Sequence, residues 1–188
     1  MKCHSITFTG AVLERGFWLY AWHVSGSGKD FVYVGRTGDN SSPHAASPFN
    51  RLGQHLDVRP AAPANMLHRH LVKHGIDPIQ ATYRLVTVGP IYPEVPGKNM
   101  SEHVKVRDDV NRMEQELADH MRAKGYEVVS NHSPSEHPLL PRYREAIEIA
   151  ETELAKFPPP RAARSVDLNA GAGSGIRTLD SLGKSQVL

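Results

Sequence analysis

An arginine and a histidine stand four residues apart in segment 47–56, where the apolar residues have helical spacing. Successive residues of a helix turn by about 100°, so Arg51 and His55 would share one face, one turn apart. A guanidinium and an imidazole placed in this way can converge on one phosphate group. Arginine suits the task because its planar fork pairs with two phosphate oxygens at once. The pair indicates a site for a phosphate-bearing substrate.

Two tyrosines lie in neighbouring segments that are typical of strands. Tyr20 belongs to the aromatic-rich segment 17–24 and Tyr33 to the segment 31–35. The polar, glycine-containing loop 25–30 between them predicts an antiparallel hairpin. With a suitable register both phenols would face one surface and lie near the substrate. A tyrosine with its ordinary pKa of about 10 is a poor base unless its surroundings lower that value.

The remaining segments predict helices and one more strand around this hairpin. Ser47 followed by Pro48 is typical of an N-cap and a first helical turn, and begins the helix that carries Arg51. Apolar periodicity predicts helices over 62–74, from 106 to Gly125, and over 140–157, with a third strand over 79–88. Residues 1–15 are compatible with a short edge strand and a turn, and 126–129 with a short extended piece. Three prolines in 89–97 predict irregular structure.

Composition excludes several classes of protein. The chain has 188 residues and a formal net charge of +2, which excludes a strongly basic, histone-like binder. A single cysteine excludes a disulfide framework and a cysteine-based zinc site. No segment has the run of about 18–20 apolar residues that a membrane span needs, and the N-terminus lacks the apolar core of a signal peptide, so we expect a soluble, cytoplasmic protein.

Positive charge is nevertheless concentrated in one stretch. Between Arg36 and His74 there are five basic and two acidic residues, a local charge of +3, and five of the 11 histidines. This concentration predicts binding to a polyanion that weakens with salt and tightens below about pH 6.5, where histidines charge.

The order of these motifs resembles that of a GIY-YIG nuclease domain over roughly residues 15–133. The matching features are Trp18-Leu19-Tyr20 on the first strand, Tyr33-Val34-Gly35 on the second, the segment 47–56 with Arg51 and His55, the helical segment 113–117 with Glu114, and Asn131 after that helix. Each motif alone is weak. Their occurrence in the family's order, on the expected elements, makes the resemblance specific.

The resemblance implies divalent-metal-dependent hydrolysis of DNA phosphodiester bonds. Tyr20 would be the candidate base, assisted by His55, and Tyr33 would position the phosphate or the attacking water. Arg51 would neutralise developing negative charge. Arg36, Arg51 and His55 would contact the nucleic acid.

The resemblance also implies a metal. Glu114 would bind Mg²⁺ or Mn²⁺, with water and phosphate completing the coordination, and Asn131 would hold the motifs together through hydrogen bonds. Two features depart from the family pattern: Trp18 stands where a glycine is usual, and the gap from Glu114 to Asn131 is longer than in the repair branch. Glu116 competes with Glu114 as the metal ligand.

Other signals lead to no site. His70 and His74 are one turn apart, but no HExxH pattern or third ligand accompanies them, and Gly26-Ser27-Gly28-Lys29 lacks the rest of a phosphate loop. Two other functions stay open: a catalytically silent nucleic-acid-binding module of the same fold, and an interaction protein whose last helix dimerises. The type of DNA, the choice between DNA and RNA, and the identity of the base also stay open.

We therefore expect an α/β (α+β) fold with a small three-stranded, mainly antiparallel sheet flanked by helices. The expected organisation is an N-terminal extension (1–15), a GIY-YIG-like nuclease domain (16–133), an amphipathic helix (134–157) that caps the domain, and a tail (158–188) with the composition of a disordered segment. DNA and Mg²⁺ or Mn²⁺ are the expected partner and cofactor. We expect neither a membrane nor a small-molecule cofactor, and the oligomeric state is open, with a homodimer as one possibility.

Overall fold

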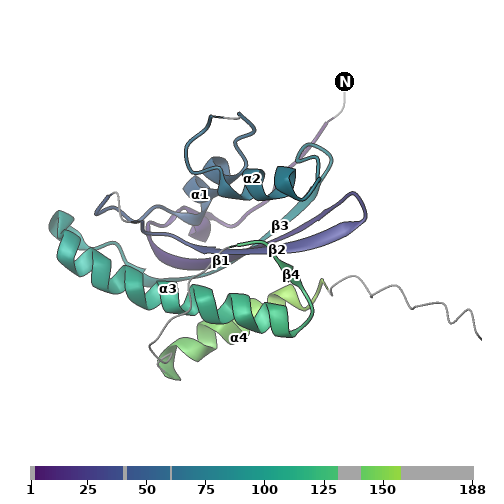
Figure 1. Cartoon of the computed structure of the whole chain (residues 1–188). Coiled ribbons are helices and arrows are strands. Elements are labelled where there is room, and N and C mark those ends of the chain that lie inside the picture. The colour runs from purple at the N-terminus through teal and green to yellow at the C-terminus, as the bar shows by residue number, and fades with distance from the viewer. Residues whose placement is uncertain (1–2, 40–41, 60, 131–140, 158–188) are drawn as a thin grey trace, which may run out of the picture.

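One sheet with helices on both faces forms the body of the protein (Figure 1). The structure is a computed structural model that describes residues 3–39, 42–59, 61–130 and 141–157. The sheet has the strand order β3-β1-β2-β4. Its strands are β1 (Gly16–Gly26), β2 (Lys29–Arg36), β3 (Thr82–Pro93) and β4 (Glu127–Val128). The expected α+β class is confirmed, but the sheet has four strands rather than three, because the short extended piece after the long helix pairs with β2 in parallel.

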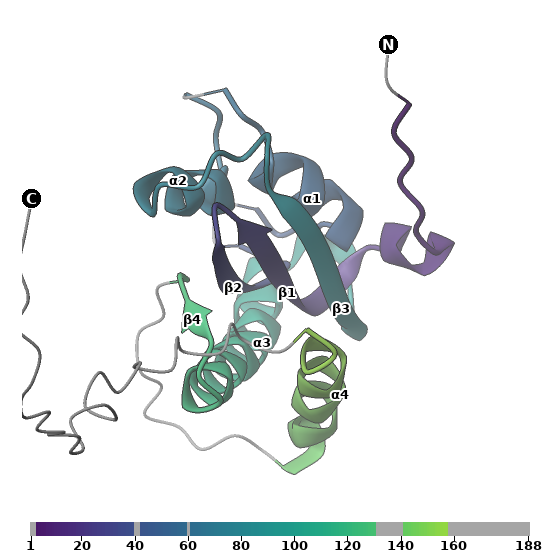
Figure 2. The same ribbon diagram turned by 90° about the vertical axis from the view of Figure 1, so that its right-hand side faces the viewer.

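Two helices cover each face of the sheet. The helices α1 (Pro48–His55) and α2 (Met66–Lys73) lie on one face, and α3 (Met100–Ala123) and α4 (Arg144–Leu154) lie on the other (Figures 1 and 2). Short 3₁₀ turns occur at Gly10–Leu13, Pro96–Lys98 and Pro141–Tyr143. The N-terminal segment forms the first of these turns and no edge strand in its described part.

The hairpin β1–β2 has the register that brings the two tyrosines onto one face. Tyr20 pairs with Gly35 and Trp22 pairs with Tyr33. Directly paired residues of antiparallel strands point to the same side, and so do residues two apart on one strand. Tyr20 and Tyr33 therefore both face α1 and α2, where they border an apolar cluster that includes Trp22 and Leu67.

The strand β3 is longer than the sequence predicts. It continues through the proline-containing segment to Pro93, and Gly16 pairs with Pro93 at its end. The prediction that 89–97 is irregular was wrong for its first half. The reason is position: β3 is an edge strand, and prolines are tolerated on an edge because the missing N–H groups need no neighbouring strand there.

The helices begin and end largely where their local signals are. The Ser47 hydroxyl accepts a hydrogen bond from the Asn50 amide, which confirms Ser47 as the N-cap of α1. The second helix starts at Met66 instead of residue 62, with Asn65 as its N-cap residue. The helix α3 begins at Met100 rather than at residue 106, with Asn99 as its N-cap. Its predicted stripe faces the core: Val106 is partly buried, and the other members are buried, namely Val110, Met113, Leu117 and Met121.

The last helix packs on its own domain. Its buried residues Ile147, Ala150 and Leu154 join the large core cluster, as does Tyr143 of the preceding 3₁₀ turn. The Tyr126 hydroxyl donates hydrogen bonds to the Leu154 and Phe157 carbonyls and so fixes the end of α4. The apolar stripe of α4 is thus used within the chain. The predicted tail from 158 onward lies outside the described residues.

None of the described helices combines the length and the apolar character that a membrane crossing would require.

Candidate active site

Tyr20 and His55 form the centre of a buried polar cluster. The Tyr20 hydroxyl oxygen lies 2.6 Å from His55 Nε2, which is a hydrogen-bond distance. The ring of Tyr20 is 3% exposed, and burial raises its pKa to about 12 although the charge of Arg51 acts in the opposite direction. Tyr20 is therefore protonated at neutral pH in this state.

His55 occupies the most buried position of α1. The residue is only 1% exposed, and burial together with the charge of Arg51 lowers its pKa to about 3. The imidazole is neutral at physiological pH and is directed at Tyr20 rather than at solvent. It therefore cannot be one of the histidines expected to charge near pH 6.5. Its Nδ1 atom is buried without a hydrogen-bond partner among the described residues.

Gly35 makes room for the Tyr20 ring. A Cβ atom at Gly35 would lie 2.5 Å from Cε2 and Cζ of Tyr20 and 2.6 Å from its hydroxyl oxygen. Contacts of that length do not occur between real side chains, so only glycine lets the ring lie across β2. The glycine of the Tyr33-Val34-Gly35 motif thus positions the tyrosine of the neighbouring strand.

Tyr33 lies between two histidines. Its ring centroid is 5.1 Å from that of His55 and 5.9 Å from that of His70, which α2 contributes. Burial is the main cause that raises the pKa of Tyr33 well above its ordinary value, and the nearby Tyr20 and Glu114 add to the effect. No signal in the sequence linked His70 to Tyr33.

Arg51 brings a positive charge to the phenol of Tyr20. Its Nη1 atom donates a 2.7 Å hydrogen bond to Gln54 Oε1, and its charge acts on Tyr20 and Tyr33. Its Nε atom is buried and has no partner in the described part of the chain. A buried N–H group without a partner is costly, and an incoming oxygen ligand could satisfy it.

Arg36 and Glu114 form an ion pair at the end of β2. Arg36 Nε lies 3.1 Å from Glu114 Oε2, and the side chains are 18% and 12% exposed. Burial raises the pKa of Glu114 to about 7, while Arg36 and Arg51 oppose that rise. Because β4 pairs only with Phe31 and Val32, β1 is the only strand among the described residues that pairs with this end of β2.

Asn131 lies outside the described residues, so its expected place in the site is not described. The residue before it, Ser130, is placed: its hydroxyl accepts a 3.1 Å hydrogen bond from the Val34 amide. The chain thus runs beside the second tyrosine motif immediately before Asn131.

Three polar residues that the sequence reasoning missed lie next to the site. Asn111 Oδ1 lies 3.4 Å from Arg36 Nε, Arg107 adds positive charge near Arg36, and Asp39 adds negative charge near Arg51. A helical signal could have found two of them. Residues 107, 111 and 114 are spaced four and three apart and so lie on one face of α3.

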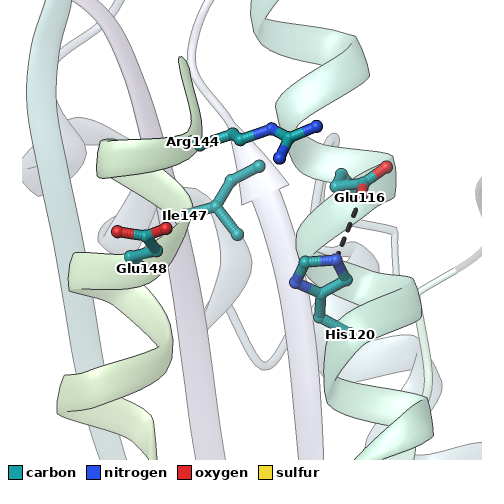
Figure 3. Close-up of a pocket in the computed structure, with 5 residues that line it drawn as sticks. All are labelled: Glu116, His120, Arg144, Ile147 and Glu148. Carbon is teal, nitrogen blue, oxygen red and sulfur yellow. Dashed lines mark hydrogen bonds and ion pairs between the residues drawn. The ribbon is translucent and has the colours of Figure 1, made fainter. Parts of the chain in front are cut away.

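The competing carboxylate, Glu116, lies elsewhere. Two residues of helix correspond to about 200°, so Glu116 points away from Glu114. Glu116 Oε1 lies 3.1 Å from His120 Nε2, and its side chain is 45% exposed. Together with residues of α4 they line a hollow of about 210 Å³ between the two helices (Figure 3). Its wall combines acidic, basic and apolar side chains: Glu116, His120, Arg144, Ile147 and Glu148.

Glu114 is a single carboxylate, and this limits the kind of metal site that fits. Among the described residues there is no group of three or more histidine, cysteine or acidic side chains able to hold an ion. That arrangement does not fit zinc, which takes three or four protein ligands. It does fit Mg²⁺ or Mn²⁺, because such ions are often bound through one or two carboxylates, with water and substrate phosphate as further ligands.

Comparison with family models, with curated proteins and with solved structures gives no match. The interpretation of the site therefore depends on its own geometry.

Proposed function

We propose that the protein is a divalent-metal-dependent endonuclease that hydrolyses DNA phosphodiester bonds, with the GIY-YIG fold that its motifs resemble. The observation that carries the proposal is that Tyr20, Tyr33 and His55 contact one another beside Arg51, while the charge of Glu114 acts on both phenols from α3. Any one of these residues has an ordinary structural interpretation. The largely buried set of two phenols, an imidazole, a guanidinium and a carboxylate lacks one, because burying these groups is costly.

Arg51 and Arg36 are the groups that would bind phosphate oxygens. The unpartnered Nε of Arg51 offers a donor, and the planar fork presents it together with a second N–H. The positive charge would stabilise the negative charge that develops on the phosphate in the transition state.

Tyr20 and His55 would move the proton of the attacking water. The Arg51 guanidinium has only donors, so the Tyr20 oxygen is the acceptor of the hydrogen bond between them. The hydroxyl hydrogen of Tyr20 is then available for donation to His55 Nε2. As the water oxygen attacks phosphorus and the bond from phosphorus to the leaving oxygen breaks, the water proton would pass to the Tyr20 oxygen and the phenol proton to His55. The pKa of about 3 makes His55 a weak base in the free protein, and a bound phosphate that neutralises the Arg51 charge would raise that pKa. The buried positions of both groups make this transfer a direct one, over 2.6 Å.

Glu114 would hold the metal ion, and Tyr33 would align the phosphate or the water. When bound, a divalent cation supplies charge stabilisation at the phosphate and at the leaving oxygen. The carboxylate has to be ionised for this task, which its pKa of about 7 allows at neutral and alkaline pH.

The test is cleavage by the full chain of supercoiled plasmid, branched DNA and single-stranded DNA, with Mg²⁺ or Mn²⁺ and with EDTA. Metal-dependent nicking or cutting of at least one substrate is the expected result. A silent binding module is the second candidate, because the ion pair with Arg36 occupies the carboxylate in this state. Salt-sensitive binding in gel shifts without cleavage of any substrate would support that candidate and contradict the nuclease.

A further inference from the structure

The ion pair between Arg36 and Glu114 blocks the carboxylate oxygen that the proposed function assigns to the metal. Arg36 Nε lies 3.1 Å from Glu114 Oε2 and 3.4 Å from Asn111 Oδ1, and Nη1 donates to the Gly38 carbonyl oxygen. The two side chains are largely buried. The guanidinium is therefore held in place by several contacts, unlike an arginine in a surface pair, which samples many positions.

A divalent cation that binds Glu114 Oε2 would have to displace Arg36. A Mg²⁺ ion binds a carboxylate oxygen at about 2.0–2.1 Å, which would place it only a few ångströms from the guanidinium carbon. The two positive charges repel each other strongly in a partly buried site. Arg107, one turn from Asn111 on α3, adds further positive charge at Arg36. Metal that binds Glu114 without DNA would also leave the buried Arg36 guanidinium without its charge partner, which is unfavourable.

A phosphate group removes this obstacle. It offers Arg36 an acceptor with negative charge and the geometry of the guanidinium fork. Once Arg36 turns from Glu114 to phosphate, the carboxylate oxygen is open, and the phosphate adds a second oxygen ligand for the cation. Arg36 stands at the end of β2, next to Gly35, and its positive charge acts on the phenol of Tyr20, so a phosphate bound by Arg36 would lie near the rest of the proposed site.

We propose that Arg36 exchanges Glu114 for a substrate phosphate, so that binding of nucleic acid opens the metal ligand and the two bind cooperatively. This inference rests on the proposed function and makes Arg36 a positioning residue as well as a DNA contact. Coupling between two ligands is reciprocal, so metal strengthens DNA binding by the same factor by which DNA strengthens metal binding. Without substrate, the site holds little metal and hydrolyses nothing.

The experiment measures Mn²⁺ binding by electron paramagnetic resonance, with and without a 20-base-pair DNA duplex. The full chain carries Tyr20→Phe in every sample so that the duplex stays intact. With Arg36 present, DNA is expected to tighten Mn²⁺ binding by about tenfold or more, within the range usual for coupled sites. With Arg36→Met, Mn²⁺ is expected to bind without DNA, and the duplex should tighten that binding by a clearly smaller factor than with Arg36 present, because only the phosphate ligand then contributes.

Two further variants separate charge from arginine geometry. Arg69→Met removes an exposed arginine of α2 that contacts only the Ala62 carbonyl among the described residues, and the coupling should persist. Arg36→Lys keeps the charge and should retain part of the coupling. Should Arg36→Met fail to fold, the wild-type chain gives the same information by nuclear magnetic resonance: the Arg36 Nε–H signal should stay in place with Mg²⁺ alone and shift when DNA is added.

The possible failures are distinct. Equal coupling with Arg36 and with Arg36→Met overturns the exchange, and so does a wild-type Nε–H signal that moves with Mg²⁺ alone. Tight Mn²⁺ binding to the Arg36 protein without DNA also overturns it but leaves the proposed nuclease intact. Mn²⁺ binding that survives Glu114→Gln, or no Mn²⁺ binding in any state, contradicts the proposed metal site and the exchange together.

Discussion

Two groups of polar residues lie on opposite sides of the same helix, each with a glutamate of α3 as a member, and they differ in burial. The Glu114 group, with Arg36, Arg51, Tyr20 and His55, is buried, and burial raises the pKa of its carboxyl to about 7. The Glu116 group, with His120 and the α4 residue Glu151, is an array of partly exposed ion pairs between α3 and α4.

The difference shows what burial does to ionisable side chains. An exposed ion pair such as Glu116–His120 contributes little to stability and leaves its members with ordinary chemistry. The Glu114 group holds charged side chains where water is mostly excluded, at the expense of stability. It also includes two nitrogen atoms, Arg51 Nε and His55 Nδ1, that are buried without hydrogen-bond partners among the described residues. That combination is typical of a functional site.

Removal of the Tyr20 hydroxyl should give a large, selective loss of activity. Tyr20→Phe keeps the ring over Gly35 but removes the group that passes the proton, so we expect cleavage to fall by about 10²- to 10⁴-fold. His55 Nε2 also loses its partner, which should lower the free energy of unfolding by about 1–3 kcal/mol. Tyr83→Phe is the control, because that hydroxyl donates to the Pro78 carbonyl outside the site. If the two variants cleave equally well, the special role of the Tyr20 group is lost.

Displacement of the Tyr20 ring should have a smaller effect than loss of its hydroxyl. A methyl group introduced by Gly35→Ala would overlap the ring, so the phenol has to shift away from His55. Misplacement of a catalytic group by about 1 Å can reduce the rate by about 10²-fold, and we expect a loss of up to that size in cleavage rate. Gly53→Ala on α1 is a suitable control because a Cβ there meets nothing within 4 Å. Wild-type rates for Gly35→Ala would show that the ring position does not matter.

The pH dependence of cleavage should report the ionisation of one group, the Glu114 carboxyl. Below its pKa of about 7, Glu114 is protonated and cannot hold a cation, so at subsaturating Mg²⁺ we expect kcat/KM to fall about tenfold per pH unit. The low pKa of His55 keeps that residue neutral over this pH range, so its ionisation adds no second slope to the plot of kcat/KM against pH. Saturating metal competes with the proton and should move the slope to lower pH. A flat rate profile from pH 5.5 to 8 would contradict the assignment.

The Glu116 group should respond only weakly to mutation. His120→Ala removes ion pairs with Glu116 and Glu151, and we expect the free energy of unfolding in urea to change by less than about 1 kcal/mol. The cleavage rate should stay the same. A loss of activity in this variant would mean that the hollow between α3 and α4 belongs to the functional part of the molecule.

The sequence predicted the elements whose signals are local. The hairpin, the Ser47 N-cap and the buried stripe of α3 are all decided by nearby residues, and the structure has them at the expected places. The extension of β3 to Pro93 was missed because it depends on the strand being at an edge, which is a property of the assembled sheet.

The sequence placed the candidate residues on their helices and strands but did not predict their contacts or charge states. Spacing placed Arg51 and His55 on one side of α1, but it could not show that His55 would be buried against Tyr20. The pairing of Arg36 with Glu114 joins residues 78 positions apart in sequence numbering, and only the packing of α3 against the sheet creates it. Charge state and burial follow from such long-range contacts, so periodicity and motif spacing carry no information on them.

The most direct measurement is a comparison of Mn²⁺-dependent plasmid cleavage by Glu114→Gln and Glu116→Gln, which remove the same charge from opposite sides of α3. The account predicts that Glu114→Gln loses about 10³-fold or more of the wild-type rate, since a metal contributes several kcal/mol to the transition state, while Glu116→Gln cleaves like wild type. Undiminished cleavage by a cleanly purified and folded Glu114→Gln protein, or equal losses in the two variants, would contradict it.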